Sequence, residues 1–380
     1  MPGVFQRQIV ATLALVASAC GAKTGLEVPD VADVSHMDAG FDVIDAFDAP
    51  RCIQGQFALT ARSADVILVI DRSGSMDEGL DGMRAPPGMS KWSLLRDALS
   101  VTLPVFQDRI NDGALFYPQT GGTGDSWCVL ATIPDVDVDP ASGNAPRVLD
   151  IINSTGPAGS TPTAAALLRA YQWFVRNPNR ARSRYLVLAT DGGPNCNALL
   201  DPSTCVCASN GLAMGRCGRR ADGIGCLDDL RTIAEIHQIA TNPIAAIPTY
   251  VIGLAGDATP VFASTLTAMA IAGGRPNISA TGTPTFFNVA QAGDLPAAFT
   301  TIQNAIARCS FVTPSQPTTA DGISIALDGT TIPRDETRMN GWDWTDRAFG
   351  EITLFGAACA QAAVGTPAVV ATVLTCDSGG

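Results

Sequence analysis

Residues 65–75 read Asp-Val-Ile-Leu-Val-Ile-Asp-Arg-Ser-Gly-Ser, and this stretch decides the fold class. Its first part, Val66 to Ile70, is a continuous run of β-branched and aliphatic side chains. Such a run is typical of a strand buried on both faces of a parallel sheet. Residues 185–189 form a second run of this kind, and helix-like patterns alternate with the strands. The sequence therefore predicts an α/β fold with a doubly wound, mostly parallel sheet.

The other expected elements continue this alternation. We expect strands at residues 114–117, 249–254 and 286–289, and helices at residues 93–107, 163–176, 227–240, 261–270 and 295–307. After Cys309 the pattern changes, because apolar residues alternate with small or polar ones at residues 323–327, and residues 352–355 and 369–374 are further strand candidates. We therefore expect a small β-rich domain at residues 310–380, with Trp342 and Trp344 in its core rather than on a carbohydrate-binding surface.

The beginning of the chain has the pattern of an export signal. Residues 1–19 contain Arg7, an apolar run too short to span a bilayer, and small residues before Cys20. The segment resembles the lipobox of bacterial lipoproteins, in which the cysteine is lipidated, although Ala17 departs from the leucine usually found there. By this resemblance, Gly21 points to the outer membrane or cell surface, with attachment by the lipid alone. Ordinary signal cleavage, giving a periplasmic or secreted protein, is the alternative.

Residues 20–51 show no helical or strand period, and aspartates recur through small and apolar residues. We interpret this segment as an extended, self-repelling tether. A calcium-binding repeat is the alternative, but the spacing is not that of an EF-hand loop. The formal net charge of the chain is -12, and no basic stripe offsets it. Such an acidic surface argues against nucleic acid as a partner, because it repels phosphates.

Polar oxygen donors stand where the two buried runs end. Asp71, Ser73 and Ser75 follow the first run, and Asp191 follows the second. Thr161 lies between them in sequence, where the chain turns into the predicted helix at residues 163–176. Ligands of open α/β sheets bind beyond the carboxyl ends of the strands. We therefore expect all five side chains at this edge.

This arrangement resembles von Willebrand factor A (vWA) domains and the inserted domain of integrins over residues 62–308. Their metal-ion-dependent adhesion site uses an Asp-x-Ser-x-Ser loop, a threonine and a later aspartate. The resemblance implies that Asp71, Ser73, Ser75, Thr161 and Asp191 are metal ligands in a domain at residues 52–309. Hydroxyl and carboxylate donors favour Mg²⁺, with Mn²⁺ or Ca²⁺ as alternatives. A carboxylate of a protein partner would complete the coordination; a purely structural ion is the alternative.

Eleven cysteines indicate an oxidising compartment, because ten remain for pairing once Cys20 is set aside for the lipid. In vWA domains a helix follows soon after the second buried strand, whereas here residues 192–227 intervene and contain Cys196, Cys205, Cys207, Cys217 and Cys226. With Cys128 these could form three disulfides whose pairing the sequence leaves open. We interpret the insertion as a rigid collar around the metal, or else as a merely stabilised insertion. We expect Cys52 to pair with Cys309, and Cys359 with Cys376.

Three classes of function can be distinguished for this sequence. The first is a metal-dependent protein-binding or adhesion module, and the second is an envelope assembly or scaffold lipoprotein without metal-regulated adhesion. The third is a hydrolase, which is disfavoured because neither His36 in the tether nor His237 inside a predicted helix is placed to activate Ser73. A phosphate-loop lysine is also missing from the glycine-rich turns. The sequence therefore predicts a binding protein rather than an enzyme.

Overall fold

The computed structural model describes residues 52–61, 63–107, 109–119, 127–138, 144–178, 182–208, 217, 223–242, 245–254, 260–278, 283–347 and 350–376. The predicted signal, Cys20 and the acidic tether lie outside these residues. Within the described part of the chain, no helix is long and apolar enough to cross a bilayer.

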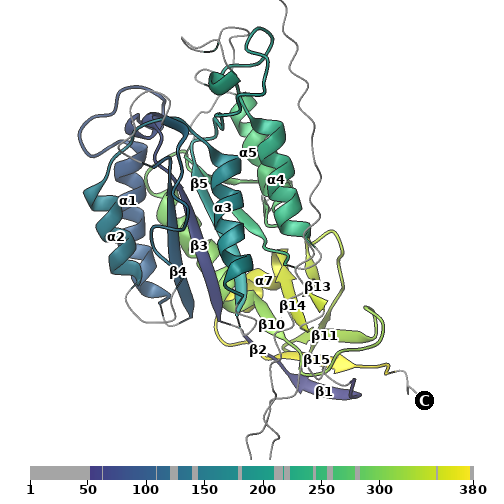
Figure 1. Cartoon of the computed structure of the whole chain (residues 1–380). Helices are drawn as coiled ribbons and strands as arrows, with labels where there is room; N and C mark the ends of the chain where they lie inside the picture. Colours follow the sequence, from purple (N-terminus) through teal and green to yellow (C-terminus); the bar gives the residue numbers. More distant parts are fainter. Residues whose placement is uncertain are drawn as a thin grey trace, which may run out of the picture. The chain divides into compact units, whose positions relative to one another are not determined.

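A parallel sheet of five strands forms the centre of the larger unit, in the order β4-β3-β5-β6-β9 (Figure 1). The strands are β3 (Ala64–Asp71), β4 (Ile110–Tyr117), β5 (Ser183–Thr190), β6 (Thr249–Gly253) and β9 (Phe287–Asn288). Every neighbouring pair is parallel. The whole of β3 is buried, as expected for an unbroken apolar run between two layers of helices. The predicted central parallel sheet is therefore confirmed.

Helices cover both faces of this sheet. Alternate residues of β3 point to opposite faces, so Leu68 packs in one hydrophobic cluster and Ile67 in the other. The first cluster contains α1 (Lys91–Thr102), α2 (Asn144–Ser154) and α6 (Asp294–Cys309). The second contains α3 (Thr163–Arg176), α4 (Asp229–Thr241) and α5 (Pro260–Ala272). Each fully buried aliphatic side chain contributes about 1.5–3 kcal/mol to this packing.

A smaller unit consists of two antiparallel sheets, with strand orders β1-β15-β11-β12 and β13-β14-β10-β2. Its strands are β1 (Gly55–Ala58), β2 (Thr60–Ala61), β10 (Ser310–Val312), β11 (Ile323–Leu327), β12 (Thr330–Ile332), β13 (Gly341–Asp346), β14 (Glu351–Phe355) and β15 (Val369–Val373). Trp342 and Trp344 lie in the hydrophobic core of this unit, as the sequence predicts. Helix α7 (Gly356–Ala363), which the sequence analysis does not predict, follows β14.

The smaller unit takes strands from both sides of the parallel-sheet unit. From the sequence, residues 52–61 are expected in the parallel-sheet domain, but β1 pairs with β15, and β2 pairs with β10. These segments are too short to show a strand period, and only the antiparallel pairing identifies their place. The remaining elements are β7 (Asn277–Ile278), β8 (Pro284–Thr285) and the short 3-10 helices η1 (Gly74–Asp77), η2 (Leu103–Val105) and η4 (Gly223–Gly225).

All ten cysteines other than Cys20 form disulfides. The pairs are Cys52–Cys376, Cys128–Cys196, Cys205–Cys226, Cys207–Cys217 and Cys309–Cys359. The expected pairs Cys52–Cys309 and Cys359–Cys376 are therefore wrong. Cys52 precedes β1 and Cys376 follows β15, so the antiparallel pairing of these strands brings the two together. Five disulfides are typical of proteins exported to an oxidising compartment.

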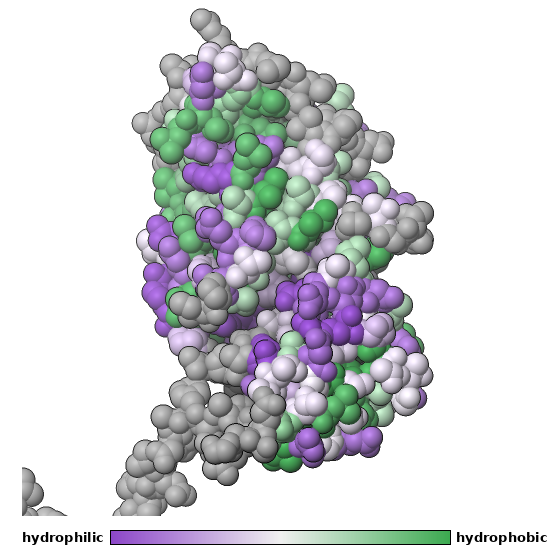
Figure 2. Space-filling model, turned by 90° about the vertical axis from the view of Figure 1, so that its right-hand side faces the viewer, coloured by the Kyte–Doolittle hydropathy of each residue, from purple (hydrophilic) through white to green (hydrophobic). Residues whose placement is uncertain are grey.

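The surface is mixed in character. On the face seen in Figure 2, hydrophobic and hydrophilic residues are interspersed over the two units. Exposed apolar side chains such as Leu199 and Leu230 occur among the described residues. Exposed apolar side chains are ordinary on protein surfaces, so they do not by themselves define an interface.

Candidate metal centre

The loop that carries three of the predicted ligands begins where β3 ends. Asp71 is fully buried, and its Oδ1 accepts a hydrogen bond of 2.8 Å from the backbone nitrogen of Ser73. Its Oδ2 accepts a hydrogen bond of 2.7 Å from Thr190 Oγ1 at the end of β5. The hydroxyl oxygens of Ser73 and Ser75 are 3.1 Å apart. Three predicted ligands thus hold their oxygen atoms within one compact loop.

Asp191 lies at the same edge of the sheet, because it directly follows β5 and β5 is the parallel neighbour of β3. Burial is the main cause that raises the pKa of Asp71, and the nearby charge of Asp191 raises it further. Two carboxylates brought together in a buried site destabilise each other unless a cation compensates their charge. The donors are carboxylate and hydroxyl oxygens, which fit a hard divalent cation such as Mg²⁺.

Thr161 lies on a segment that contacts both of these loops. The backbone nitrogen of Gly74 donates a hydrogen bond of 3.1 Å to Gly159 O. The backbone nitrogen of Thr161 donates one of 2.8 Å to Asn195 Oδ1, and the nitrogen of Asn195 donates one of 2.9 Å to Thr161 O. The structure therefore brings the three sequence-distant segments that carry the five predicted ligands to one edge of the sheet.

The contacts of the segment that carries Thr161 require a glycine at position 159. Its φ of +86° lies in the left-handed region, and a Cβ there would stand 2.8 Å from Pro118 Cγ and 3.0 Å from Trp127 O. Any larger residue would push the segment that carries Thr161 away from its neighbours.

Lys91, the first residue of α1, also lies at this edge, and the sequence analysis does not predict it. Its Nζ is 3.0 Å from Asp191 Oδ2, 3.3 Å from Ser75 O and 3.8 Å from Glu78 Oε2. A lysine at the start of a helix is usually a solvated surface residue, so its position alone does not point to Lys91. One signal was available in the sequence, because the chain contains only two lysines, Lys23 and Lys91.

A disulfide lies beside the centre. Cys196, which follows Asn195, pairs with Cys128, and the carbonyl of the neighbouring Trp127 accepts a hydrogen bond of 3.1 Å from the backbone nitrogen of Ser160. The disulfide therefore links the loop after β5 to a segment that contacts the loop of Thr161. This part of the cysteine-rich insertion is directly connected to the predicted ligands.

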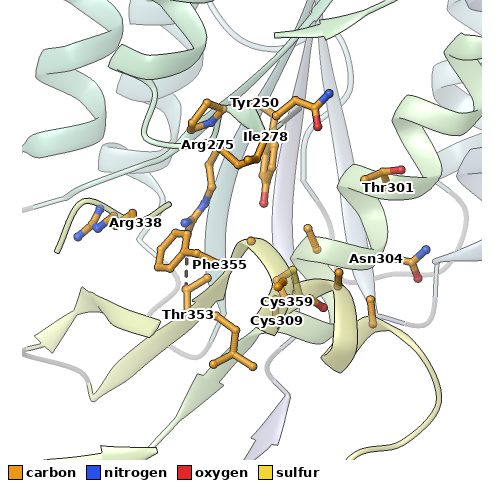
Figure 3. A pocket seen from close by; sticks show the side chains of 18 of the residues that line it. Tyr250, Arg275, Ile278, Thr301, Asn304, Cys309, Arg338, Thr353, Phe355 and Cys359 are labelled. Atoms are coloured by element: carbon orange, nitrogen blue, oxygen red, sulfur yellow. Dashed lines mark hydrogen bonds between the residues drawn. A yellow bond between two sulfur atoms is a disulfide. The ribbon is translucent and has the colours of Figure 1, made fainter. Parts of the chain in front are cut away.

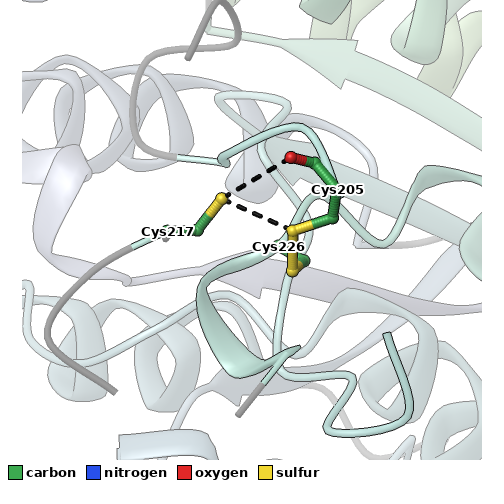
Figure 4. Close-up of side chains that lie close together, drawn as sticks. All are labelled: Cys205, Cys217 and Cys226. Carbon is green, nitrogen blue, oxygen red and sulfur yellow. Dashed lines mark hydrogen bonds between the residues drawn. A yellow bond between two sulfur atoms is a disulfide. The ribbon is translucent and has the colours of Figure 1, made fainter. Parts of the chain in front are cut away.

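Three other sulfur atoms come close together in the insertion, but they do not form a metal site. Figure 4 shows Cys205, Cys217 and Cys226, with 3.4 Å between Sγ of Cys205 and Sγ of Cys217. Cys205 is bonded to Cys226, and Cys217 is bonded to Cys207. Metals bind the free thiolate, so sulfur atoms consumed in disulfides are not available as ligands.

A cavity of about 560 Å³ lies at the opposite edge of the parallel sheet, between the two units (Figure 3). Arg275 is buried there, and its guanidinium carbon is 5.6 Å from the ring centre of Tyr185 and 4.8 Å from that of Phe355. Its Nη2 donates a hydrogen bond of 3.5 Å to Thr353 Oγ1. These contacts join the two units and are separate from the predicted metal ligands.

No protein-family model matches the chain, and no curated protein matches it in sequence. Among solved structures, the PilB minor pilin from Streptococcus sanguinis is similar with a TM-score of 0.44 and 18% identity. That match covers 65% of this chain and 62% of the pilin, so the chain spans less than two thirds of its length. The vWF domain of the type V pili tip protein Mfa5 from Porphyromonas gingivalis is similar with a TM-score of 0.40 and 15% identity, over 65% of this chain and 96% of that one. The manganese-loaded Plasmodium vivax TRAP protein is similar with a TM-score of 0.39 and 14% identity, over 65% and 76%.

Proposed function

We propose that the parallel-sheet unit is a doubly wound vWA domain that binds a divalent cation and uses it to bind a carboxylate of a partner protein. Asp71, Ser73, Ser75, Thr161 and Asp191 are the proposed ligand positions, some of them acting through water. Mg²⁺ is the expected ion, with Mn²⁺ and Ca²⁺ as alternatives. The observation that carries this proposal is the meeting of three sequence-distant segments at one edge of the sheet, through the Thr190–Asp71, Gly74–Gly159 and Thr161–Asn195 hydrogen bonds.

The residues of the chain have distinct roles in this proposal. Asp71 and Asp191 provide the negative charge, and the hydroxyls of Ser73, Ser75 and Thr161 provide neutral oxygen donors. Because only part of its charge is neutralised by these side chains, a bound divalent cation attracts a carboxylate from outside the protein. The hydrogen bonds to Thr190 and to the nitrogen of Ser73 fix the Asp71 carboxylate in one orientation.

We further propose that the protein is exported and works as an adhesion or binding module rather than as an enzyme. The five disulfides support an oxidising location. Lipidation at Cys20 would tether the domain to the outer membrane or cell surface. His237 lies within α4, and the hydrogen bonds of Ser73 are made with Asp71 and Ser75, which supports a role in ion binding rather than as a nucleophile.

Calorimetric titration with MgCl₂ or MnCl₂ tests the metal site. Wild-type protein should bind one ion per chain, and Asp71→Ala should lose this binding while it stays folded. Asp97→Ala removes an exposed carboxylate from α1 and serves as the matched control. Equal binding by wild-type protein and Asp71→Ala would contradict the proposed site.

Capture of extracellular and envelope proteins on the immobilised protein tests the partner. Capture should require Mg²⁺, disappear with EDTA and be absent with Asp71→Ala. A partner retained equally under all three conditions would instead indicate a scaffold protein that binds without metal.

A further inference from the structure

Lys91 lies within the predicted metal centre, where its ammonium group contacts the same residues that would hold the ion. Its side chain is 6% exposed, and that of its partner Asp191 is 8% exposed. Its Nζ lies 3.0 Å from Asp191 Oδ2, 3.3 Å from the backbone oxygen of Ser75 and 3.8 Å from Glu78 Oε2. Asp191 and Ser75 are predicted metal ligands, and Lys91 contacts the carboxylate of the first and the backbone carbonyl of the second. Lys91 therefore supplies a positive charge where the two predicted acidic ligands concentrate negative charge.

Hydrogen bonds fix the backbone from which the side chain of Lys91 extends. The nitrogen of Lys91 donates a hydrogen bond of 2.9 Å to Glu78 O, which closes the loop of residues 79–90. Ser90 caps α1 by accepting a hydrogen bond of 3.2 Å from the nitrogen of Ser93. A change in the position of the ammonium group is therefore expected to come from rotation of the long side chain, without unfolding the start of the helix.

We propose that Lys91 is an internal cation of this site, which competes with the divalent ion for Asp191 and so sets the affinity of the site. This inference rests on the proposed metal site. In the metal-free protein the ammonium group compensates the charge of Asp191. When a divalent ion binds, Lys91 must release Asp191, because two cations close to one carboxylate repel each other in a buried site.

Glu78 provides the place to which Lys91 can move. Its carboxylate already lies 3.8 Å from Nζ, and its side chain is 46% exposed. A rotation of Lys91 toward Glu78 would keep its charge paired and move it toward solvent. Metal occupancy is thereby coupled to the loop of residues 79–90, which lies between Glu78 and Lys91. The structure thus assigns Lys91 and Glu78 to control of metal affinity, a role that the five predicted ligands do not have.

Substitution of Lys91 by a neutral side chain of similar length tests the competition. Lys91→Met should bind Mg²⁺ and Mn²⁺ at least about tenfold more tightly than wild-type protein in calorimetric titrations. Lys91→Arg keeps the charge and should remain close to wild type. Arg96→Met removes one positive charge from the exposed side of the same helix and should leave the affinity unchanged, which separates the local contact from the net charge.

A second measurement follows the ammonium group itself. In a Lys23→Arg background Lys91 is the only lysine, so ¹³C-methylation of lysine gives one side-chain NMR signal from residue 91. Addition of MgCl₂ should shift this signal, because Lys91 leaves Asp191. The measurement does not depend on a variant at position 91, and it remains decisive if Lys91→Met fails to fold.

The outcomes distinguish two proposals, the metal site itself and the competition between Lys91 and the ion. If wild-type protein binds the ion but the affinity of folded Lys91→Met is unchanged or lower, the competition is overturned and the metal site stands. An unchanged Lys91 signal on saturation with Mg²⁺ has the same meaning. If neither wild-type protein nor Lys91→Met binds either ion, the metal site and the competition are both overturned.

Discussion

Thr190 Oγ1 donates a hydrogen bond of 2.7 Å to Asp71 Oδ2, so that the last residue of β5 holds the last residue of β3. The same Thr190 oxygen accepts a hydrogen bond of 3.2 Å from the nitrogen of Gly192. Both strand ends that carry the predicted acidic ligands are therefore fixed by one hydroxyl group. Thr190 is not a predicted ligand, but we therefore expect its substitution to affect the site.

Thr190→Val should lower the free energy of unfolding by about 1–3 kcal/mol, because it leaves a buried carboxylate oxygen without its donor. Urea unfolding in the absence of metal measures this change. Thr249→Val is the matched control, since the buried hydroxyl of Thr249 in β6 has no hydrogen-bond partner within the described part of the chain and its loss should be neutral or stabilising. Equal destabilisation by the two variants would show that the Thr190–Asp71 bond has no special importance.

Gly159→Ala should weaken metal binding and lower stability. The new Cβ would meet Pro118 and the carbonyl of Trp127, at a φ that residues other than glycine rarely adopt. Gly274→Ala has a similar positive φ of +68°, but no atom lies within 4 Å of its Cβ position. The control should therefore lose stability from backbone strain alone and keep wild-type Mg²⁺ affinity in calorimetric titration. A Gly159→Ala protein with wild-type affinity would show that the position of Thr161 does not depend on this contact.

The fold was predictable where the local pattern is strong. The apolar run at residues 66–70 is typical of a strand buried on both faces of a parallel sheet, and β3 is such a strand. Helix α3 has the predicted bounds, Thr163–Arg176. Helix α2 was missed, because Pro146 and nearby glycine and serine residues obscure its period. Short strands such as β1 carry no period, and their place depends on pairing with distant β15.

The meeting of the segments that carry the proposed acidic and hydroxyl ligands was predictable, because these residues directly follow buried strands or precede a helix, which places them at one edge of the sheet. The proposed role of Lys91 was not predictable, because it depends on how α1 packs against that edge, and the scarcity of lysine in the chain does not show this packing. The disulfide pairing could not be predicted from the sequence either. Cys309 in α6 bonds to Cys359 because α7 packs beside α6. Contacts between distant segments are set by packing rather than by local sequence.

Asp112 in β4 should make the stability depend on pH. Burial raises its pKa to about 7, and its Oδ2 has no hydrogen-bond partner among the residues that the structure describes. Between the ordinary pKa of 3.8 and about 7, the unfolded chain releases a proton that the folded protein keeps. The contribution of Asp112 to the free energy of unfolding therefore decreases as the pH rises through this range. Each unit of pKa difference corresponds to about 1.4 kcal/mol.

Asp112→Asn removes this titration. Its free energy of unfolding should exceed that of wild-type protein at pH 8, and the difference should shrink toward pH 4. Urea unfolding at a series of pH values measures it, and comparison with wild type cancels the contributions of other carboxyl groups. An equal difference at pH 4 and pH 8 would show that Asp112 does not titrate as its burial indicates.

The Cys128–Cys196 disulfide should support both stability and the metal site. It joins residues 68 apart in sequence, and closing a loop of this size contributes about 2–5 kcal/mol to the stability of a native protein. Replacement of both cysteines by serine should therefore lower the free energy of unfolding by a similar amount. It should also weaken Mg²⁺ binding, because Asn195, which holds Thr161, directly precedes Cys196.

The double replacement of Cys207 and Cys217 is the matched control, since that disulfide closes a shorter loop, with a separation of 10, within the insertion. Loss of stability without loss of affinity in the Cys128 and Cys196 variant would limit the role of the disulfide to folding, whereas loss of both supports its link to Thr161.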